Sequence, residues 1–225
     1  EDFHIEGLGQ NIPFLAAVMD QDRFKSGALA TNYITDEFPE GFNGTVPTDF
    51  QTDVMTAVAS SMHRVMAARA RTIGNGLAQR GVREDWIVFV GKQERAVTLV
   101  DGAAGLDVVL SEEGRTLSLT EIDWRPGKPT YKGLLNGRAF TVAVLPAAEG
   151  FTIRHRAAKA QVVVLTPHSA ELHKRLPAKQ AADTSKLIIS PMPGLVVSIE
   201  VALGQEVKEG EIVCIIEAMK MQNII

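Results

Sequence analysis

The stretch Glu217-Ala218-Met219-Lys220-Met221 contains the side chain best suited to covalent chemistry, the amine of Lys220. It follows an apolar run, residues 212–216, which predicts a buried strand that ends in a short turn. A lysine amine on such a turn is open to acylation, and the loss of its charge costs the fold little. Large apolar side chains on a solvent-facing turn, such as the two flanking methionines, rarely serve stability. We therefore weigh a modified lysine against an ordinary surface lysine between two strands.

The residues around Lys220 resemble the biotin-attachment signature of biotin carboxyl carrier domains, Ala-Met-Lys-Met. Upstream, Ser190-Pro191-Met192-Pro193-Gly194 lies where such domains carry a Pro-Met-Pro-Gly turn. The resemblance implies that Lys220 receives covalent biotin from a biotin protein ligase. It also implies that Ala218, Met219 and Met221 form the attachment motif around that lysine.

Other chemical constellations are incomplete in this sequence. His168 and His173 are not at the spacing that places two metal ligands on one helix face. The single cysteine, Cys214, rules out a structural zinc site built on a cysteine pair. There is no P-loop and no Gly-x-Ser-x-Gly elbow, and Gly74-Asn75-Gly76 follows a predicted helix rather than a strand. The sequence thus predicts neither a catalytic residue nor a metal site of its own.

The composition is that of a folded protein of one or two domains, with 225 residues, 45% of them hydrophobic and 22% charged. The net charge is -4, without a Lys or Arg cluster, which argues against nucleic-acid and anionic-membrane partners. No run approaches the roughly 18 apolar residues of a membrane span. A lone cysteine suits a reducing compartment. Because the sequence starts at Glu1, we expect it to be part of a longer chain.

The first 45 or so residues predict a strand, a helix and a second strand. Asn11 is a plausible N-cap with Pro13 in the first turn, Ser26-Gly27 closes the helix, and Ala28 to Ile34 is a weak strand. This segment is too small for an independent core. It resembles the closing stretch of a biotin carboxylase domain at residues 11–15 and 23–27, which implies an ATP-binding body before Glu1.

The longest predicted helix runs from Thr48 to about Ile73, roughly 39 Å at 1.5 Å per residue. Thr48 or Asp49 can cap it. Two adjacent apolar stripes make its apolar arc wide, so we expect burial on more than one side. The two possibilities are an ordinary amphipathic helix and a helix wrapped by a sheet.

After Trp86 the hydrophobic period changes from 3.6 to 2, and glycines separate short runs of alternating residues. Asn136-Gly137 is a strong signal for a two-residue hairpin. The predicted strands are residues 86–90, 96–100, 107–110, 116–119, 130–135, 139–145, 151–155 and 161–165. Such strands with tight turns predict an antiparallel sheet that is closed or nearly closed. The fold class is therefore α+β, mainly β, with an eight-stranded barrel around a central helix and a partial flattened barrel of the biotinyl type after it.

Taken together, the linker Phe38 to Gly44 and the run Glu217 to Asn223 resemble the alpha subunits of the propionyl-CoA carboxylase family. The resemblance implies four segments: 1–45, the end of a biotin carboxylase domain; 46–176, a subunit-docking helix and barrel; 177–186, a flexible linker; and 187–225, the first half of a carrier domain. Half of a flattened barrel is expected to leave edge strands unpaired.

The resemblance also implies a function. ATP, bicarbonate and Mg²⁺ would be used in a biotin carboxylase domain outside this sequence. The carboxyl group would travel on Lys220 to a carboxyltransferase beta subunit in a hetero-oligomer, which would convert propionyl-CoA to methylmalonyl-CoA. The expected location is the bacterial cytoplasm or the mitochondrial matrix, and this segment alone should be inactive. The alternatives are a methylcrotonyl-CoA or acetyl-CoA carboxylase, a lipoyl carrier, and a non-enzymatic assembly module.

The stretch from Gly74 to Trp86 is the predicted contact with the carboxyltransferase partner. It joins the helix to the barrel, carries Arg80 and Arg83, and ends in a tryptophan, a common interface anchor. The alternative is that Trp86 fills the barrel.

Overall fold

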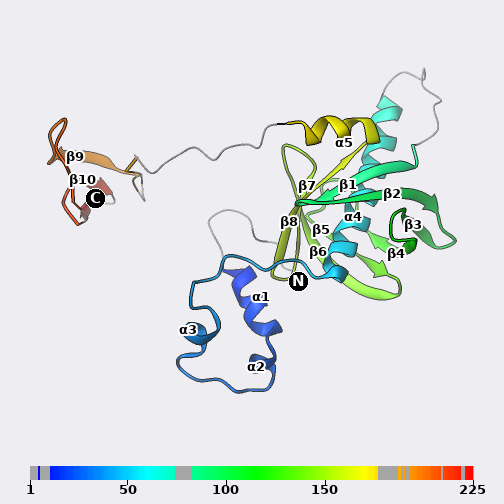
Figure 1. Ribbon diagram of the computed structural model, residues 1–225, viewed down its shortest axis with the longest axis horizontal. Coiled ribbons are helices and arrows are strands. Elements are labelled where there is room, and N and C mark those ends of the chain that lie inside the picture. The colour runs from blue at the N-terminus through cyan, green and yellow to red at the C-terminus, as the bar shows by residue number, and fades with distance from the viewer. Residues whose placement is uncertain are drawn as a thin grey trace. The chain divides into compact units, whose positions relative to one another are not determined.

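The computed structural model describes residues 5, 11–73, 83–176, 187, 188, 190, 193–208, 210–218 and 221–224; at residues 71–73 it describes the backbone alone. The chain forms two compact units, Glu1–Leu176 and Pro177–Ile225, and each is described by itself (Figure 1). Among the described residues, no helix is long and apolar enough to cross a membrane.

The central element of the first unit is the helix α4 (Asp49–Ile73). Thr48 begins it with a reciprocal pair of hydrogen bonds: Gln51 N donates to Thr48 Oγ1 over 3.3 Å, and Thr48 N donates to Gln51 Oε1 over 2.9 Å. This is a capping box, which satisfies two otherwise unpaired donors at the helix start. The prediction of a long helix capped at Thr48 is confirmed.

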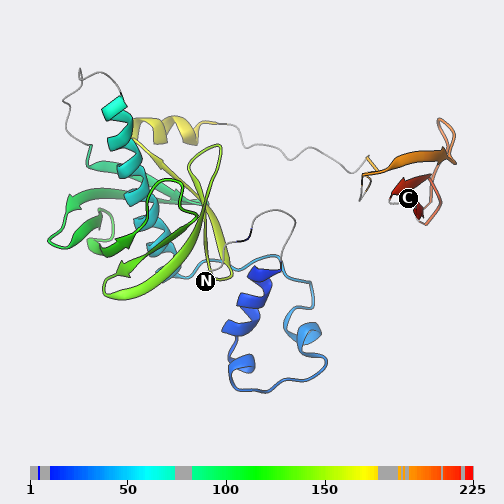
Figure 2. The ribbon, with the colours of Figure 1, turned by 180° about the vertical axis from the view of Figure 1, so that it is seen from behind.

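Eight antiparallel strands surround this helix as a closed barrel in which β1 pairs with both β2 and β8 (Figures 1 and 2). They are β1 (Asp85–Val90), β2 (Gln93–Asp101), β3 (Gly105–Leu110), β4 (Arg115–Asp123), β5 (Thr130–Leu135), β6 (Arg138–Pro146), β7 (Phe151–His155) and β8 (Ala158–Leu165). The barrel order is the chain order, so each strand pairs with its sequence neighbour. Closure leaves no free sheet edge.

The predicted hairpin turn at Asn136-Gly137 is present between β5 and β6. Both residues have positive φ, 50° and 78°, as a type I′ turn requires, and Leu135 pairs with Arg138 across it. The side chain of Asn136 also accepts a hydrogen bond from Ser118 N at 2.8 Å, which ties the turn to β4. A turn residue thus helps to hold the neighbouring strand.

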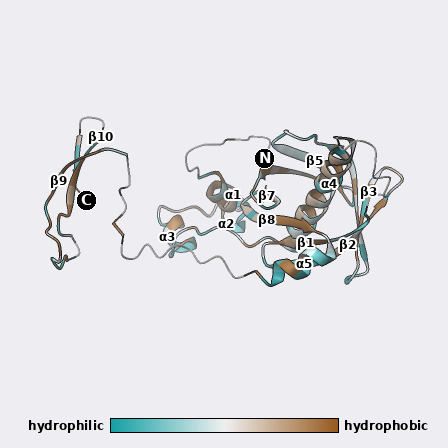
Figure 3. Cartoon of the chain, turned by 90° about the horizontal axis from the view of Figure 1, so that it is seen from above, coloured by the Kyte–Doolittle hydropathy of each residue, from teal (hydrophilic) through white to brown (hydrophobic). Residues whose placement is uncertain are grey.

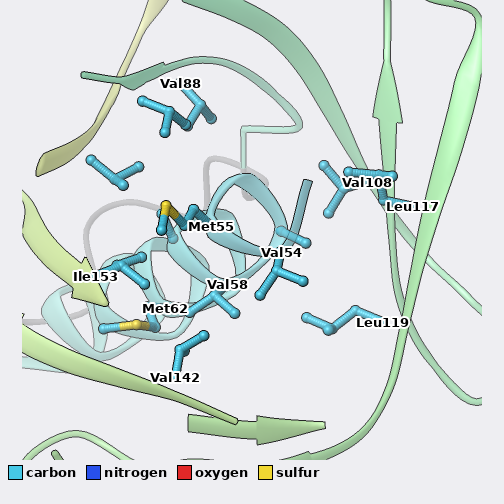
Figure 4. Packing of buried hydrophobic residues seen from close by; sticks show 14 of the residues in the cluster. Val54, Met55, Val58, Met62, Val88, Val108, Leu117, Leu119, Val142 and Ile153 are labelled. Carbon is cyan, nitrogen blue, oxygen red and sulfur yellow. The ribbon is translucent and has the colours of Figure 1, made fainter. Parts of the chain in front are cut away.

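The core lies between α4 and the inner face of the barrel. Val54, Met55 and Val58 have no exposed surface, and Met62 is 2% exposed (Figure 4). Strand residues alternate between buried and partly exposed positions along β3, β5 and β7, as expected when one face packs on the helix. The prediction of a barrel around a central helix is confirmed, because α4 is buried on all sides in its first half.

The segment before α4 contains α1 (Ile12–Asp20), α2 (Asp22–Lys25) and α3 (Tyr33–Glu37). The strand expected at Ala28 to Ile34 is wrong. Its last two residues belong to α3, where Asp36 N donates to Asn32 O over 2.9 Å, and Ile34 is 56% exposed. No neighbouring strand pairs with the stretch among the described residues. The end of this stretch therefore forms local helical hydrogen bonds instead of pairing with a neighbouring strand.

The predicted helix after Asn11 is interrupted at Gln21, whose extended backbone (ψ 140°) separates α1 from α2. An ion pair between Arg156 and Asp20, 2.8 Å, attaches the end of α1 to the turn between β7 and β8. The rings of Phe14, Phe38 and Phe42 meet edge to face at 5.2 to 5.9 Å between centroids. These contacts gather the segment around a small aromatic cluster.

A short helix that the sequence analysis did not predict, α5 (Pro167–Lys174), follows the barrel. Thr166 caps it by accepting a hydrogen bond from Ser169 N at 3.1 Å, and Pro167 occupies its first turn. It carries both hydrophilic and hydrophobic residues, while β8 beside α4 is largely hydrophobic (Figure 3). Its buried face is small, with Ala170 at 1% exposure, which is why hydrophobic periodicity gave little signal.

The second unit contains a three-stranded antiparallel sheet in the order β11-β10-β9, built from β9 (Leu195–Ile199), β10 (Cys214–Ala218) and β11 (Met221–Ile224). The expectation of a buried strand at residues 212–216 needs correction. The strand begins two residues later, Ile212 is 42% exposed, and only Ile216 of this sheet's described residues is buried, at 5%. The other apolar side chains of the sheet are half-buried or exposed, with Leu195 at 72% and Ile199 at 69%.

Candidate functional site

The attachment motif lies at the hairpin between β10 and β11. The strands pair Ile216 with Asn223, Glu217 with Gln222, and Ala218 with Met221. Met219 and Lys220 are therefore the two residues that connect the paired ends, although their own placement lies outside the described residues. The expected turn over residues 217–221 is thus shorter, because Glu217, Ala218 and Met221 belong to the strands.

Gly194, the last residue of the Pro-Met-Pro-Gly motif, has a steric role next to β10; Pro191 and Met192, and with them the predicted turn, lie outside the described residues. A Cβ on Gly194 would stand 2.5 Å from Ile216 Cγ2 and 2.6 Å from the carbonyl oxygen of Glu217. Real Cβ atoms do not approach other atoms so closely, so only glycine lets the start of β9 lie against β10. The two sequence motifs lie side by side, because Leu195, directly after Gly194, pairs with Glu217 of β10.

The surroundings of the connection are open. Met221 is 64% exposed and Glu217 is exposed, while the buried Ile216 anchors β10 two residues before the connection. A loop on the same unit is held by side-chain bonds: Gln205 Oε1 accepts from Ala202 N at 3.0 Å, and Glu211 Oε2 accepts from Lys208 N at 3.1 Å. An anchored strand with an open end suits covalent attachment of a cofactor to a lysine amine.

The remaining predicted site residues are only partly described. Arg80 and the linker 177–186 lie outside the described residues, as do Met219 and Lys220. Arg83 is exposed, and its carbonyl oxygen accepts a 2.9 Å hydrogen bond from Trp86 Nε1. The partner contact of Arg80 and Arg83 stays a prediction.

Trp86 itself is only 9% exposed and belongs to the barrel core. Its ring meets the imidazole of His63 on α4 edge to face, with 4.4 Å between centroids. Burial lowers the pKa of His63, which keeps this imidazole neutral at pH 7. Trp86 therefore packs inside the barrel, which is the alternative to an interface anchor that the sequence left open.

A large groove that the sequence did not reveal lies at one end of the barrel. It has a volume of about 1150 Å³. Its walls are the second half of α4, the β4–β5 and β6–β7 connections, the end of β8, and α5. Its apolar lining includes Met62, Met66, Trp124, Phe151 and Leu172. Met66 and Leu172 are about half exposed, at 47% and 51%. The groove forms because α4 extends beyond the barrel that encloses its first half.

Metal chemistry finds no support in the part of the chain that the structure describes. No group of three or more His, Cys, Asp or Glu side chains there is arranged to hold an ion. His173, which sequence spacing had already argued against as a ligand, packs instead against the ring of Phe89, 5.2 Å between centroids.

Comparison with known families divides the chain at nearly the place where its two units meet. Residues 55–179 match the propionyl-coenzyme A carboxylase BT domain, and residues 186–225 match the family described as biotin-requiring enzyme. The second match contains the β10–β11 hairpin and identifies biotin as the cofactor of this part of the chain.

Whole-chain relatives agree with these matches. The chain is 38% identical over 227 residues to the propionyl-CoA carboxylase alpha chain of Ruegeria pomeroyi, covering 100% of this chain and 33% of that one. It is 33% identical to the mitochondrial alpha chain of Rattus norvegicus, covering 99% and 31%. A methylcrotonoyl-CoA carboxylase subunit alpha of Dictyostelium discoideum is 20% identical, covering 100% and 34%.

The chain thus spans about a third of the length of the curated relatives that it matches. Its helix-centred barrel accounts for most of the first family match, which begins inside α4 and ends just after α5. Because that match covers more than half of the residues, the chain belongs to the propionyl-CoA carboxylase BT domain family.

Proposed function

We propose that this chain is the biotin-carrying and subunit-docking part of an ATP-dependent acyl-CoA carboxylase, with biotin attached to Lys220. The observation that carries the proposal is the β10–β11 hairpin, whose Ala218–Met221 pairing leaves Met219 and Lys220 as the connection. This hairpin lies within the residues that match biotin-requiring enzymes.

The described residues fit the cofactor. Lys220 would hold biotin through an amide bond to its Nζ, beside the exposed Met221 and the half-buried Ala218. When bound, biotin supplies a ring nitrogen that accepts and releases a carboxyl group. The chain's own contribution is to present that group at the end of an anchored hairpin. Gly194 and the buried Ile216 provide the anchor.

The proposed reaction uses sites outside this chain. ATP, bicarbonate and Mg²⁺ would be used in a biotin carboxylase domain, to which residues 1–45 would belong. A carboxyltransferase beta subunit would then convert propionyl-CoA to methylmalonyl-CoA. The names of the relatives at 38% and 33% identity support propionyl-CoA, whereas the methylcrotonoyl-CoA relative is only 20% identical. The proposed location is the bacterial cytoplasm or the mitochondrial matrix, in line with the sources of those relatives.

The proposed division of labour follows the same segments. Residues 46–176 would dock the carboxyltransferase subunit, and residues 187–225 would carry biotin on the linker 177–186. A tethered carrier suits transfer between separate sites, since a flexible linker lets one group visit both. The exposed Arg83 and the groove residues Met66 and Leu172 are the docking surface that we would test first.

The attachment site is tested by expressing the chain within its complete polypeptide together with a biotin protein ligase. Streptavidin should detect the parent and the control variant Lys208→Arg, which changes another lysine of the same unit. It should not detect Lys220→Arg, because a guanidinium is not acylated by this route. A signal retained in Lys220→Arg would refute the assignment of biotin to this residue.

Docking is tested separately by pull-down of the carboxyltransferase subunit with the complete polypeptide. Leu172→Asp places a charge in the groove, and Arg83→Ala removes the exposed cation. We expect at least one of them to weaken capture at least tenfold, while Lys159→Ala on the strand β8 leaves capture unchanged. Equal capture by all three variants would show that the partner docks on another surface. It would leave the assignment of biotin to Lys220 untouched.

A further inference from the structure

The helix α4 is fixed inside the barrel by an ionic cluster that joins three parts of the fold. Asp53, on the buried first half of the helix, accepts a hydrogen bond from Arg95 Nη1 of β2 at 2.6 Å. It also accepts two from Arg115 of β4, at 2.8 and 3.0 Å. Glu113, in the turn before β4, pairs with Arg115 and lies 3.7 Å from Arg95. Arg95 and Asp53 are both 7% exposed.

Along one face of α4 the side chains repeat every four residues. Val54, Val58, Met62 and Met66 recur every four residues, and so do the hydroxyl residues Thr52, Thr56 and Ser60. A slip by one turn, about 6 Å along the helix axis, would replace most of these side chains by similar ones. Figure 4 shows members of the repeating stripe side by side against the barrel wall. Packing elsewhere on the helix is less regular, because a slip that brings residue i+4 to each wall position would place His63 and Arg64 in the fully buried positions of Ala59 and Ser60.

The polar contacts do not repeat in this way. A slip that brings residue i+4 to each wall position would place Ala57 before Arg95 and Arg115, leaving two guanidinium groups without a carboxylate from the helix. It would also place Val65 before the Tyr131 hydroxyl, which now donates to Ser61 Oγ over 2.9 Å. The opposite slip supplies Asp49 to the arginines. However, it moves Gln51 into the buried place of Met55.

Two further contacts reinforce the same position of the helix. Gln51 Nε2 donates to the carbonyl oxygen of His155 on β7 over 3.2 Å, and Arg64 Nη2 donates to Asp101 Oδ1 of β2 over 2.6 Å. Polar contacts therefore meet the barrel at four levels of α4: Gln51, Asp53, Ser61 and Arg64. Among them, only Asp53 engages two cations at once.

From this arrangement we propose that the Asp53–Arg95–Arg115 cluster acts together with the small buried residues Ala59 and Ser60 to select the axial register of α4 in the barrel. The cluster penalises the slip that brings residue i+4 to each wall position, and thereby helps to fix how far the second half of the helix projects. Buried ionic groups add little net stability compared with well-packed apolar residues, but they penalise any arrangement that separates them. The cluster would thus act mainly against wrong registers. Its removal should loosen the helix position more than it lowers the stability of the barrel.

The test uses the 225-residue chain with Asp53→Leu and Arg95→Met combined, which removes both buried charges while Arg115 keeps Glu113. The matched control combines Asp20→Leu with Arg156→Met, which removes the ion pair between α1 and the turn that joins β7 to β8. Hydrogen exchange is measured by mass spectrometry for α4 and for the barrel strands, since local opening appears there separately from global unfolding.

A second readout reports the register directly. In a Trp124→Phe background, Trp86 is the only tryptophan, and its ring contacts His63 of α4. A slip by one turn would put Ala59 or Ala67 there instead. The fluorescence decay of Trp86 should therefore show a single environment in the parent and in the control, but at least two in the Asp53→Leu/Arg95→Met variant.

We expect that variant to keep the barrel's circular dichroism, while exchange in α4 becomes at least tenfold faster relative to the strands. Exchange within twofold of the parent, with one Trp86 environment, would overturn the proposal. Loss of the fold would overturn it as well, because the cluster would then supply stability rather than select a register.

Discussion

The hydrogen bond between Tyr131 and Ser61 provides a sharp test of how the helix is held in the barrel. Tyr131 has no exposed surface, and its hydroxyl donates to Ser61 Oγ over 2.9 Å. Ser61→Ala would leave the phenol O–H buried without this acceptor, which costs about 1–3 kcal/mol. Tyr131→Phe removes the donor and leaves a serine that can turn to its own helix, so we expect a loss of only about 0.5–1.5 kcal/mol.

The double variant should lose less stability than the sum of the two single variants. We expect a coupling of about 1 kcal/mol, the size typical of neighbouring polar groups. The assay is urea unfolding of the 225-residue chain and the three variants, followed by far-UV circular dichroism at pH 7. Additive losses, or a larger loss for Tyr131→Phe than for Ser61→Ala, would refute this account of the bond.

The same group predicts the behaviour of the fold in alkali. Burial raises the pKa of Tyr131 from 10.0 to about 12, although the bond to Ser61 opposes the shift. Because the folded state holds this proton more tightly, its contribution is complete below the unfolded pKa of about 10 and is lost as the pH rises to about 12. At about 1.4 kcal/mol per pKa unit, the loss approaches 3 kcal/mol.

This loss is measurable because the chain has only two tyrosines, Tyr33 and Tyr131. In a Tyr33→Phe background, absorbance at alkaline pH follows Tyr131 alone, and unfolding curves at the same pH values give the stability. Adding Tyr131→Phe should flatten the stability curve over this range. An unchanged slope would show that Tyr131 does not cause the loss.

Three further predictions concern the carrier hairpin and the ionic cluster. Gly194→Ala should destabilise the sheet by about 1–3 kcal/mol through overpacking against Ile216 and the Glu217 carbonyl, and should reduce streptavidin detection. The control Lys208→Arg, at an exposed position of the same unit, should leave detection unchanged. Met219→Leu and Met221→Leu should alter carboxyl transfer by the complete enzyme, while its melting temperature stays within about 2 °C of the parent value. A large loss of stability without a change in activity would instead favour a structural role for these methionines. Burial acts to raise the pKa of Asp53, but hydrogen bonds from Arg115 and Arg95 outweigh it and lower the pKa. The stability that this carboxylate contributes should therefore be complete above its unfolded pKa of about 3.9, and should fall as acid protonates it in the folded state. In acid unfolding curves, Asp53→Asn should remove part of that fall.

Local pattern determined a large part of this protein. The eight strands, the long helix and its cap at Thr48 follow from hydrophobic period and turn chemistry, because each signal lies within a few adjacent residues. The same holds for Asn136-Gly137, whose positive φ values belong to the turn itself. The motif around Lys220 also needed no tertiary information, since it is contiguous. Its biotin is nevertheless a proposal at that residue, because the structure does not describe Lys220 itself.

Elements whose state depends on distant contacts were harder to predict. The stretch from Ala28 to Ile34 has strand-like residues, yet the described chain offers it no ladder, and α3 forms instead. The helix α5 buries little, so its capping residue Thr166 was the main available signal. Trp86 could have been an interface anchor or a core residue, and only its contacts with His63 and with the Arg83 carbonyl place it in the core.

The ionic cluster and the groove were decided by the tertiary structure alone. Asp53 meets Arg95 and Arg115 across 42 and 62 residues of sequence, and any of the other carboxylates could have paired with them as far as the sequence tells. Barrel closure brings β2 and β4 to the same level of α4, and this level decides the pairing. The groove likewise exists because the barrel encloses only the first half of the helix, while Met66 and Ala67 continue one apolar face beyond the enclosed part. Sequence patterns indicate which side chains are apolar enough to be buried, whereas closure of the barrel decides which side chains come into contact.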